Sequence, residues 1–187
     1  MSPFAIIYLT TCAFWFLSEL WLLIFRRARK KSQDKKSLLL IWSAIMGGIF
    51  FANTSIFVLL GRFPNSYYPV RWLGVALMIF GIVFRLLAIK TLGEYFRVNV
   101  VTSDDQRLVK TGFYRIIRHP AYTGSLVTCL GMGLALGSWG SLAILVIPVS
   151  LAYHFRMRVE EKALLNRFGD DYKNYMKKTY RLIPYLY

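Results

Sequence analysis

The sequence predicts an all-α integral membrane protein, a bundle of five transmembrane helices followed by cytoplasmic C-terminal helices. Of its 187 residues, 56% are hydrophobic, and they fall in long blocks typical of a multi-pass membrane protein. The net charge is +15, and most basic residues lie between these blocks, where they would face the cytoplasm and anionic membrane lipids. This placement argues against nucleic-acid binding. The length suits a single domain covering residues 1–187.

Three apolar blocks occupy residues 4–25, 38–60 and 70–89. The first would span roughly 33 Å as a helix, enough to cross a bilayer. The segment 26–36, which follows it, carries seven basic residues and puts this loop in the cytoplasm and the N-terminus outside. Glu19 and Arg85 lie inside apolar blocks, where ionisable residues are rare. Glu19 could pair with Arg85 or with the basic loop, and Arg85 could extend to the interface.

The second half begins with a polar segment, 90–120, followed by two short apolar runs, 121–136 and 141–155. Each run would be about 24 Å or shorter as a helix, so a tight helical hairpin is predicted, with Gly133 and Gly137 allowing close approach. Residues 153–168 should form one helix that leaves the membrane, with Gly169 as its C-cap and Asp170 as the N-cap of a second short helix. The three segments assigned to the cytoplasm, 26–36, 90–120 and 156–187, hold 21 of the 24 basic residues, which supports five spans.

Polar groups that could carry chemistry gather in segments assigned to the cytoplasmic face. The pattern reads Gly112-x-Tyr114, Arg118-His119-Pro120-x-Tyr122-x-Gly124, Glu160-Glu161 and Phe168-Gly169-x-x-Tyr172. This linked pattern resembles the isoprenylcysteine carboxyl methyltransferase family, which belongs to a wider group with the phospholipid methyltransferases. The resemblance covers roughly residues 99–184, whereas the first two spans carry no family signature. Residues 1–90 would then hold three spans, and 91–187 a methyltransferase-like cofactor-binding part.

The resemblance implies an integral membrane enzyme, a protein-S-isoprenylcysteine O-methyltransferase. It would use S-adenosylmethionine to methylate the carboxylate of a C-terminal prenylated cysteine, or a related lipid-linked acceptor, and release S-adenosylhomocysteine. Arg156 would bind the substrate carboxylate and act as the catalytic residue. Gln106 stands where eukaryotic members often have histidine. Carried over by position, the residues that would bind the donor are Asn99, Gln106, Arg107, Leu108, Val109, Tyr114, His119, Pro120, Ala121, Tyr122 and Glu160.

The residue types suit this chemistry on physical grounds. His119 suits the donor carboxylate, and Glu160 suits its ammonium group through a charge-assisted hydrogen bond. Tyr114 and Tyr122 could stack on adenine or lie against the sulfonium. Arg156 lies four residues before Glu160 and shares its helix face, whereas Glu161 points about 100° away and should have a different, structural part. The acceptor carboxylate is already ionised above a pKa of about 3.5, so methyl transfer needs no general base.

Other interpretations stay open. A phospholipid N-methyltransferase is the main alternative, and an NADPH-dependent membrane reductase and a non-catalytic membrane adaptor are two more. At the level of single residues, His119 could merely cap a helix, and Arg156 and Glu160 could form a simple intrahelical ion pair. Tyr114 and Tyr122 could belong to an interfacial aromatic belt. Headgroup contacts are the favoured role for three basic residues: Lys110, Arg115 and Arg118. The two cysteines have no metal-binding spacing, so no metal site is predicted.

Overall fold

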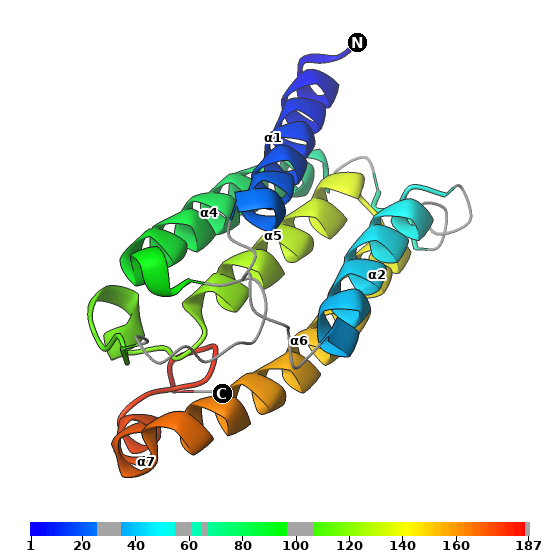
Figure 1. Cartoon of the computed structure of the whole chain (residues 1–187). Coiled ribbons are helices and arrows are strands. Elements are labelled where there is room, and N and C mark those ends of the chain that lie inside the picture. The colour runs from blue at the N-terminus through cyan, green and yellow to red at the C-terminus, as the bar shows by residue number, and fades with distance from the viewer. Residues whose placement is uncertain (26–34, 55–60, 65–66, 97–106, 186–187) are drawn as a thin grey trace.

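The computed structural model of the chain describes residues 1–25, 35–54, 61–64, 67–96 and 107–185. This part of the chain is helical, and its only β pairing is two isolated bridges. The all-α class is therefore confirmed. The elements in order are α1 (Pro3–Phe25), α2 (Lys35–Ala52), α4 (Tyr68–Leu92), the 3-10 helices η2 (Gly93–Tyr95) and η3 (Gly112–Arg115), α5 (Pro120–Leu136), α6 (Trp139–Phe168) and α7 (Asp170–Lys177) (Figure 1).

Three helices of the described chain, α1, α4 and α6, are long and apolar enough to cross a membrane. The apolar part of α2, Leu39–Ala52, and the whole of α5 are shorter. The protein is thus a multi-pass membrane protein, while the count of five spans and the hairpin topology remain predictions. The helix α6 is continuous over 30 residues despite Pro148 in its interior, so its charged second half continues the apolar first half without a break.

The predicted second span was wrong at its C-terminal end. It was expected to reach residue 60, but α2 ends at Ala52. The Asn53 amide nitrogen donates to the Ile49 carbonyl, and the Thr54 hydroxyl donates to the Phe51 carbonyl. Such side-chain bonds to the last turn compete with continuation of a helix. Residues 55–60 lie outside the described part of the chain.

Glycines let α4 and α5 pack with their backbones almost in contact. A Cβ added at Gly131 would lie 2.5 Å from the Gly74 carbonyl oxygen, and one added at Gly81 would lie 2.6 Å from the Gly124 carbonyl oxygen. No real Cβ fits at those separations, so the sequence can form this crossing only with glycine there. The crossing sets where the first turn of α5 lies relative to Arg85, which follows Gly81 by one helical turn on α4.

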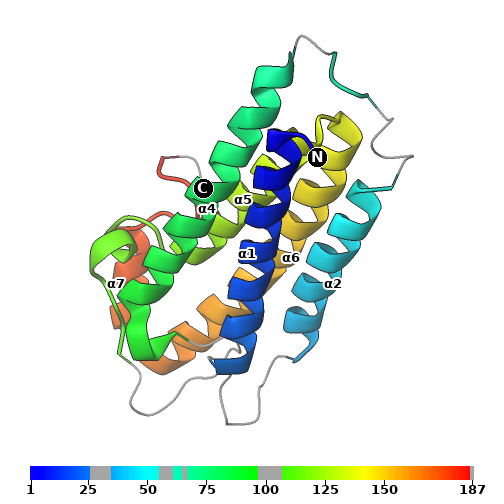
Figure 2. The ribbon, with the colours of Figure 1, turned by 90° about the horizontal axis from the view of Figure 1, so that it is seen from above.

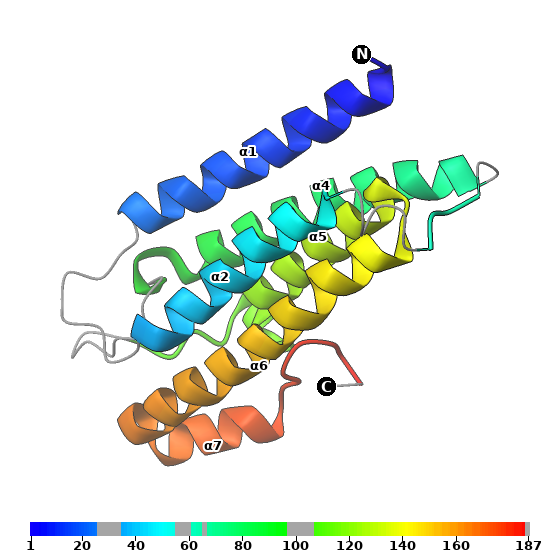
Figure 3. The ribbon, with the colours of Figure 1, turned by 90° about the vertical axis from the view of Figure 1, so that its right-hand side faces the viewer.

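The helices form an elongated bundle. Figure 3 shows the C-terminal ends of α1 and α4 at the same end of the bundle as the N-terminus of α2, with α7 folded against the end of α6. Figure 3 shows α1 along one side of the bundle formed by the other long helices, and Figure 2 looks onto that side. Gly169 has a positive φ of 52° and ends α6 as predicted. The cap of α7 was predicted one residue too late, because Gly169 is its cap and Asp170 is its first helical residue.

Candidate functional site

The predicted motif lies where α5 begins. Pro120 is the first residue of this helix, where its missing N–H is least costly. His119 precedes the helix, but its side chain makes no capping hydrogen bond. Its ring is instead buried, with the residue 6% exposed. The simple helix-cap interpretation of His119 is therefore wrong, and the ring belongs to a packed polar cluster.

Tyr122, in the first turn of α5, contacts two residues of α6. Its hydroxyl donates a 2.7 Å hydrogen bond to Oε2 of Glu160. Its ring stacks on that of His119, with centroids 5.5 Å apart, and on that of Tyr153, with centroids 4.7 Å apart. The two tyrosines and the histidine form a continuous aromatic column. Tyr122 is therefore not a lipid-facing belt residue.

The two adjacent glutamates differ in environment, as their angular offset predicted. The Glu160 side chain is 33% exposed, whereas that of Glu161 is 5% exposed. Oε1 of Glu161 accepts from Nε of Arg118 and from Nε of Arg181, both at 3.1 Å. Glu160 is thus the carboxylate that a ligand can reach, and Glu161 is an internal structural anchor.

His119 lies between the two carboxylates. Its Nε2 is 3.2 Å from Oε1 of Glu161, and its Nδ1 is 3.9 Å from Oε2 of Glu160. The side chain is 4% exposed. A ring flanked by two acids and almost fully buried offers little surface to an anionic ligand. The geometry favours a role for His119 in positioning its neighbours over direct binding of a donor carboxylate.

Tyr114, on η3, is also buried near this cluster. The hydroxyl of Tyr175 donates a 2.6 Å hydrogen bond to the Tyr114 carbonyl, which fixes η3 against α7. Burial raises the pKa of Tyr114, and the nearby Glu160 carboxylate raises it further. Burial also raises the pKa of Tyr175 to about 12. Both phenols are therefore neutral near pH 7 and keep their hydrogen-bond donors.

The other predicted donor residues precede η3 in the chain. Arg107, Leu108 and Val109 belong to an irregular segment that leads to η3, with Arg107 exposed and the other two partly buried. Asn99 and Gln106 lie outside the described residues. The structure thus brings together His119, Tyr122 and Glu160, with Tyr114 close by, and Pro120 and Ala121 form the turn that holds them.

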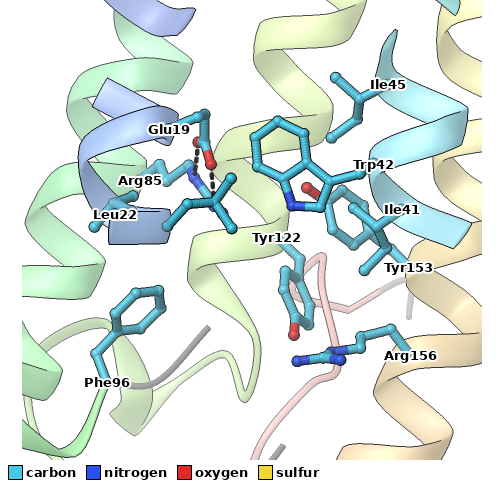
Figure 4. Close-up of a pocket in the computed structure, with 11 residues that line it drawn as sticks. Glu19, Leu22, Ile41, Trp42, Ile45, Arg85, Phe96, Tyr122, Tyr153 and Arg156 are labelled. Atoms are coloured by element: carbon cyan, nitrogen blue, oxygen red, sulfur yellow. Dashed lines mark hydrogen bonds and ion pairs between the residues drawn. The ribbon is translucent and has the colours of Figure 1, made fainter. Parts of the chain in front are cut away.

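Arg156 lies on the inner side of Tyr122 and lines a cavity that reaches into the bundle (Figure 4). Arg156 is buried, at 3% exposure. Figure 4 shows the Tyr122 hydroxyl pointing toward the Arg156 guanidinium. The cavity is lined by side chains from five helices and the segment after η2: Glu19, Leu22, Leu23, Ile41, Trp42, Ile45, Arg85, Phe96, Tyr122, Tyr153 and Arg156.

Glu19 and Arg85 form an ion pair at the upper edge of this cavity. Nε of Arg85 is 2.6 Å from Oε1 of Glu19, and one terminal nitrogen is 3.0 Å from Oε2. The other terminal nitrogen donates a 2.9 Å hydrogen bond to the Ala121 carbonyl. Of the open alternatives, pairing between these two residues is the one observed. Arg85 thereby links α1 to the first turn of α5.

Two arginines of this cluster differ from what the sequence predicted. Arg181, from the segment after α7, pairs with Glu161, but no local pattern marked it. Arg118 was expected to contact lipid headgroups, but its guanidinium is turned inward to Glu161 and the carbonyl oxygen of Met176. Both guanidinium groups donate to Glu161, so this buried carboxylate is paired and hydrogen-bonded. The exposure of Lys110 and Arg115 suits the headgroup contacts predicted for them.

The chemistry of this cluster fits S-adenosylmethionine. Glu160 offers a reachable anionic group for an ammonium. The Tyr122 ring is stacked between His119 and Tyr153, and its hydroxyl holds the Glu160 carboxylate in place. Among the described residues, no cluster of histidine, cysteine and acidic side chains could hold a metal ion.

The chain is similar in sequence to known methyltransferases. A family model described as phospholipid methyltransferase matches residues 69–171. The probable protein-S-isoprenylcysteine O-methyltransferase of Oryza sativa subsp. indica is 30% identical over 128 residues, covering 66% of this chain and 67% of the relative. The protein-S-isoprenylcysteine O-methyltransferase of Saccharomyces cerevisiae is 37% identical over 116 residues, covering 61% of this chain and 48% of the relative.

A solved structure shares the fold. It is the eukaryotic intramembrane Ras methyltransferase ICMT (isoprenylcysteine carboxyl methyltransferase), determined without a monobody, with a TM-score of 0.69 at 21% identity. The match covers 96% of this chain and 65% of that one. The chain therefore spans between about half and two thirds of the length of these relatives.

Proposed function

The chain belongs to the isoprenylcysteine carboxyl methyltransferase family, within the wider phospholipid methyltransferase family, and on this premise we propose that it methylates the carboxylate of a C-terminal prenylated cysteine, or of a related lipid-linked acceptor. The methyl donor in this proposal is S-adenosylmethionine. One observation carries the proposal. Tyr122 bonds to the accessible Glu160 carboxylate and, together with Arg156, also lines the internal cavity.

On the donor side, Glu160 would bind the ammonium group. Its carboxylate is partly exposed, and the hydrogen bond from Tyr122 fixes one oxygen in place. Tyr114 and Tyr122 would provide aromatic surface for adenine or the sulfonium. The family resemblance also implies donor binding by Asn99 and by the run from Gln106 to Val109.

On the acceptor side, Arg156 would bind the carboxylate through its planar guanidinium. The cavity next to it is lined mainly by apolar and aromatic side chains, which suits an isoprenoid or similar chain. Entry of such a chain would require lining side chains such as Trp42 to move.

The reaction requires alignment and little proton chemistry. An acceptor carboxylate oxygen forms a bond to the methyl carbon as the carbon–sulfur bond breaks, and the sulfonium becomes a neutral thioether. No proton moves. Arg156 and Glu160 would hold the two reactants in line, and the buried surroundings would limit water.

The bundle end that carries this site would face the cytoplasm. The described elements at that end flank the most basic segments of the chain, 26–36, 90–120 and 156–187. The positive-inside rule assigns such segments to the cytoplasm. A cysteine-labelling experiment with a membrane-impermeant reagent, on single cysteines placed at Lys162 and Arg62, would test the orientation: only the Arg62 position should react from outside.

The test of function is formation of S-adenosylhomocysteine by the purified chain in lipid, with N-acetyl-S-farnesylcysteine as acceptor. Turnover that depends on the free carboxylate supports the proposal, and the methyl ester of the same compound is the matched control. Turnover with phosphatidylethanolamine and none with the farnesylcysteine would overturn it.

A phospholipid N-methyltransferase is the second candidate, because the matching family model carries that description. The two activities differ in pH dependence. An amine acceptor must be neutral to react, so its rate should rise toward alkaline pH, whereas a carboxylate is ionised throughout the range from pH 6 to 9. Calorimetry with S-adenosylhomocysteine and NADPH separates both from a membrane reductase, and binding of neither would favour a non-catalytic adaptor.

A further inference from the structure

The segment after α7, residues 179–182, runs alongside the motif that begins α5. Ile117 and Tyr180 form a parallel β-bridge. The Arg118 amide donates to the Tyr180 carbonyl at 2.8 Å, and the His119 amide donates to the Arg181 carbonyl at 3.1 Å. Backbone hydrogen bonds therefore hold this segment against residues 117–119, which lead into α5.

A second set of contacts extends this attachment into α5. The Thr123 hydroxyl donates a 2.8 Å hydrogen bond to the Leu182 carbonyl. The Arg118 guanidinium donates to the carbonyls of Met176 and Thr179 and so spans the end of α7. Figure 1 shows the C-terminal chain, in red, returning from α7 toward the beginning of α5.

The Arg181 side chain is directed at the buried Glu161. Its Nε lies 3.1 Å from both carboxylate oxygens, and its terminal Nη2 also contacts Oε2. Glu161 Oε1 is in turn 3.2 Å from Nε2 of His119. An anionic side chain that is 5% exposed needs such partners, because an unpaired buried charge is strongly unfavourable.

These contacts connect Arg181 to the donor side of the site through two intermediates. Arg181 fixes the orientation of the Glu161 carboxylate, and that carboxylate fixes the His119 ring. The ring then stacks on Tyr122, whose hydroxyl holds Glu160. With Arg181 in place, both oxygens of the Glu161 carboxylate are held, and so is the ring that contacts Oε1. Without Arg181, the carboxylate keeps its hydrogen bond from Arg118 Nε to Oε1, whereas Oε2 is free to move, which loosens the His119 ring.

We propose that the C-terminal segment 179–182 is part of the donor site and that Arg181 is a positioning residue, acting through Glu161 and His119 on the binding of the donor. This inference rests on the proposed function, since it concerns the same S-adenosylmethionine site. It adds a residue outside the recognised motif and assigns a binding role to the end of the chain.

The test measures binding of S-adenosylhomocysteine by calorimetry, without acceptor, on the full chain in lipid nanodiscs. Arg181→Gln should raise the Kd about tenfold, the scale of one lost charge-assisted hydrogen bond. Arg181→Lys keeps the charge without the planar fork and should recover part of this loss. Arg158→Gln is the matched control, because Arg158 is exposed on the same helix as Glu161.

Thermal unfolding and steady-state kinetics separate positioning from general support of the fold. A positioning role predicts that Arg181→Gln raises KM for the donor and leaves KM for the acceptor unchanged. If Arg181→Gln does not fold, Arg181→Lys decides. A higher Kd for S-adenosylhomocysteine at an unchanged Tm supports the role, and an unchanged Kd overturns it.

The outcomes also separate this inference from the proposed function. An unmodified chain that fails to bind S-adenosylhomocysteine overturns the proposed function, and the inference with it. An unmodified chain that binds it, together with an Arg181→Gln variant that binds as tightly as Arg158→Gln, overturns the role of Arg181 alone.

Discussion

The hydroxyl of Tyr122 donates a 2.7 Å hydrogen bond to Glu160, although the two residues are 38 positions apart and lie on different helices. The bond crosses from the first turn of α5 to the charged second half of α6. It fixes the carboxylate that is most accessible to a ligand in this cluster. The two residues should therefore be energetically coupled in donor binding.

A double-mutant cycle tests that coupling. Tyr122→Phe and Glu160→Gln, singly and together, should give a coupling free energy of about 1–2 kcal/mol in binding of S-adenosylhomocysteine. The matched control pair is Tyr153→Phe with Glu160→Gln, because the Tyr153 hydroxyl bonds to Ser125 instead. Additive effects in the Tyr122 pair would show that the hydrogen bond does not organise the site.

Glu160→Ala should weaken donor binding by roughly ten- to a hundredfold, because it removes the charged partner proposed for the donor ammonium. Calorimetric Kd values for S-adenosylhomocysteine measure this effect. Asp171→Ala is the control, since Asp171 is an exposed acid on α7. Equal affinities for the two variants would remove Glu160 from the donor site.

Arg156→Ala should damage use of the acceptor and leave donor binding nearly intact. The acceptor kcat/KM should fall about a hundredfold, the scale of a lost positioning contact, and the Kd for S-adenosylhomocysteine should stay within about twofold. Arg158→Ala, two positions later and exposed, is the control. Normal acceptor turnover by Arg156→Ala would contradict its assigned role.

Glu19→Leu should destabilise the fold by about 3 kcal/mol, because it leaves the Arg85 guanidinium partly buried without its acid. The double variant Glu19→Leu with Arg85→Met removes both charges and should recover much of this stability. Thermal unfolding in lipid measures both. A double variant no more stable than Glu19→Leu would mean that Arg85 matters mainly through its bond to the Ala121 carbonyl.

Gly131→Ala should be destabilising by about 1–3 kcal/mol, since its Cβ would lie 2.5 Å from the Gly74 carbonyl oxygen and force α4 and α5 apart. Gly47→Ala is the control, because nothing lies within 4 Å of a Cβ added there. That substitution should be neutral or stabilising by up to about 1 kcal/mol, from helix propensity alone. The order of the two melting temperatures checks the prediction.

Local pattern was enough to predict much of this molecule. Long apolar blocks separated by basic segments predicted a helical membrane protein, and helices occupy each block in the described chain. Turn chemistry predicted the end of α6 at Gly169, because glycine adopts a positive φ that other residues avoid. The end of α2 was missed, since hydrophobicity alone does not reveal that Asn53 and Thr54 bond back to the helix.

The motif likewise predicted that His119, Tyr122 and Glu160 lie close together. The angular offset between adjacent helical residues separated Glu160 from Glu161. By itself, then, the sequence determined the fold class, the family and the segments that meet, because these follow from periodicity, charge and motif spacing.

Only the tertiary structure decided the partners within those segments. It turned Arg118 inward, brought Arg181 to Glu161 and paired Glu19 with Arg85. These contacts join residues from 20 to 66 positions apart. No local pattern encodes such pairs, because they depend on how closely the glycine faces let α4 and α5 approach and on where the chain after α7 returns.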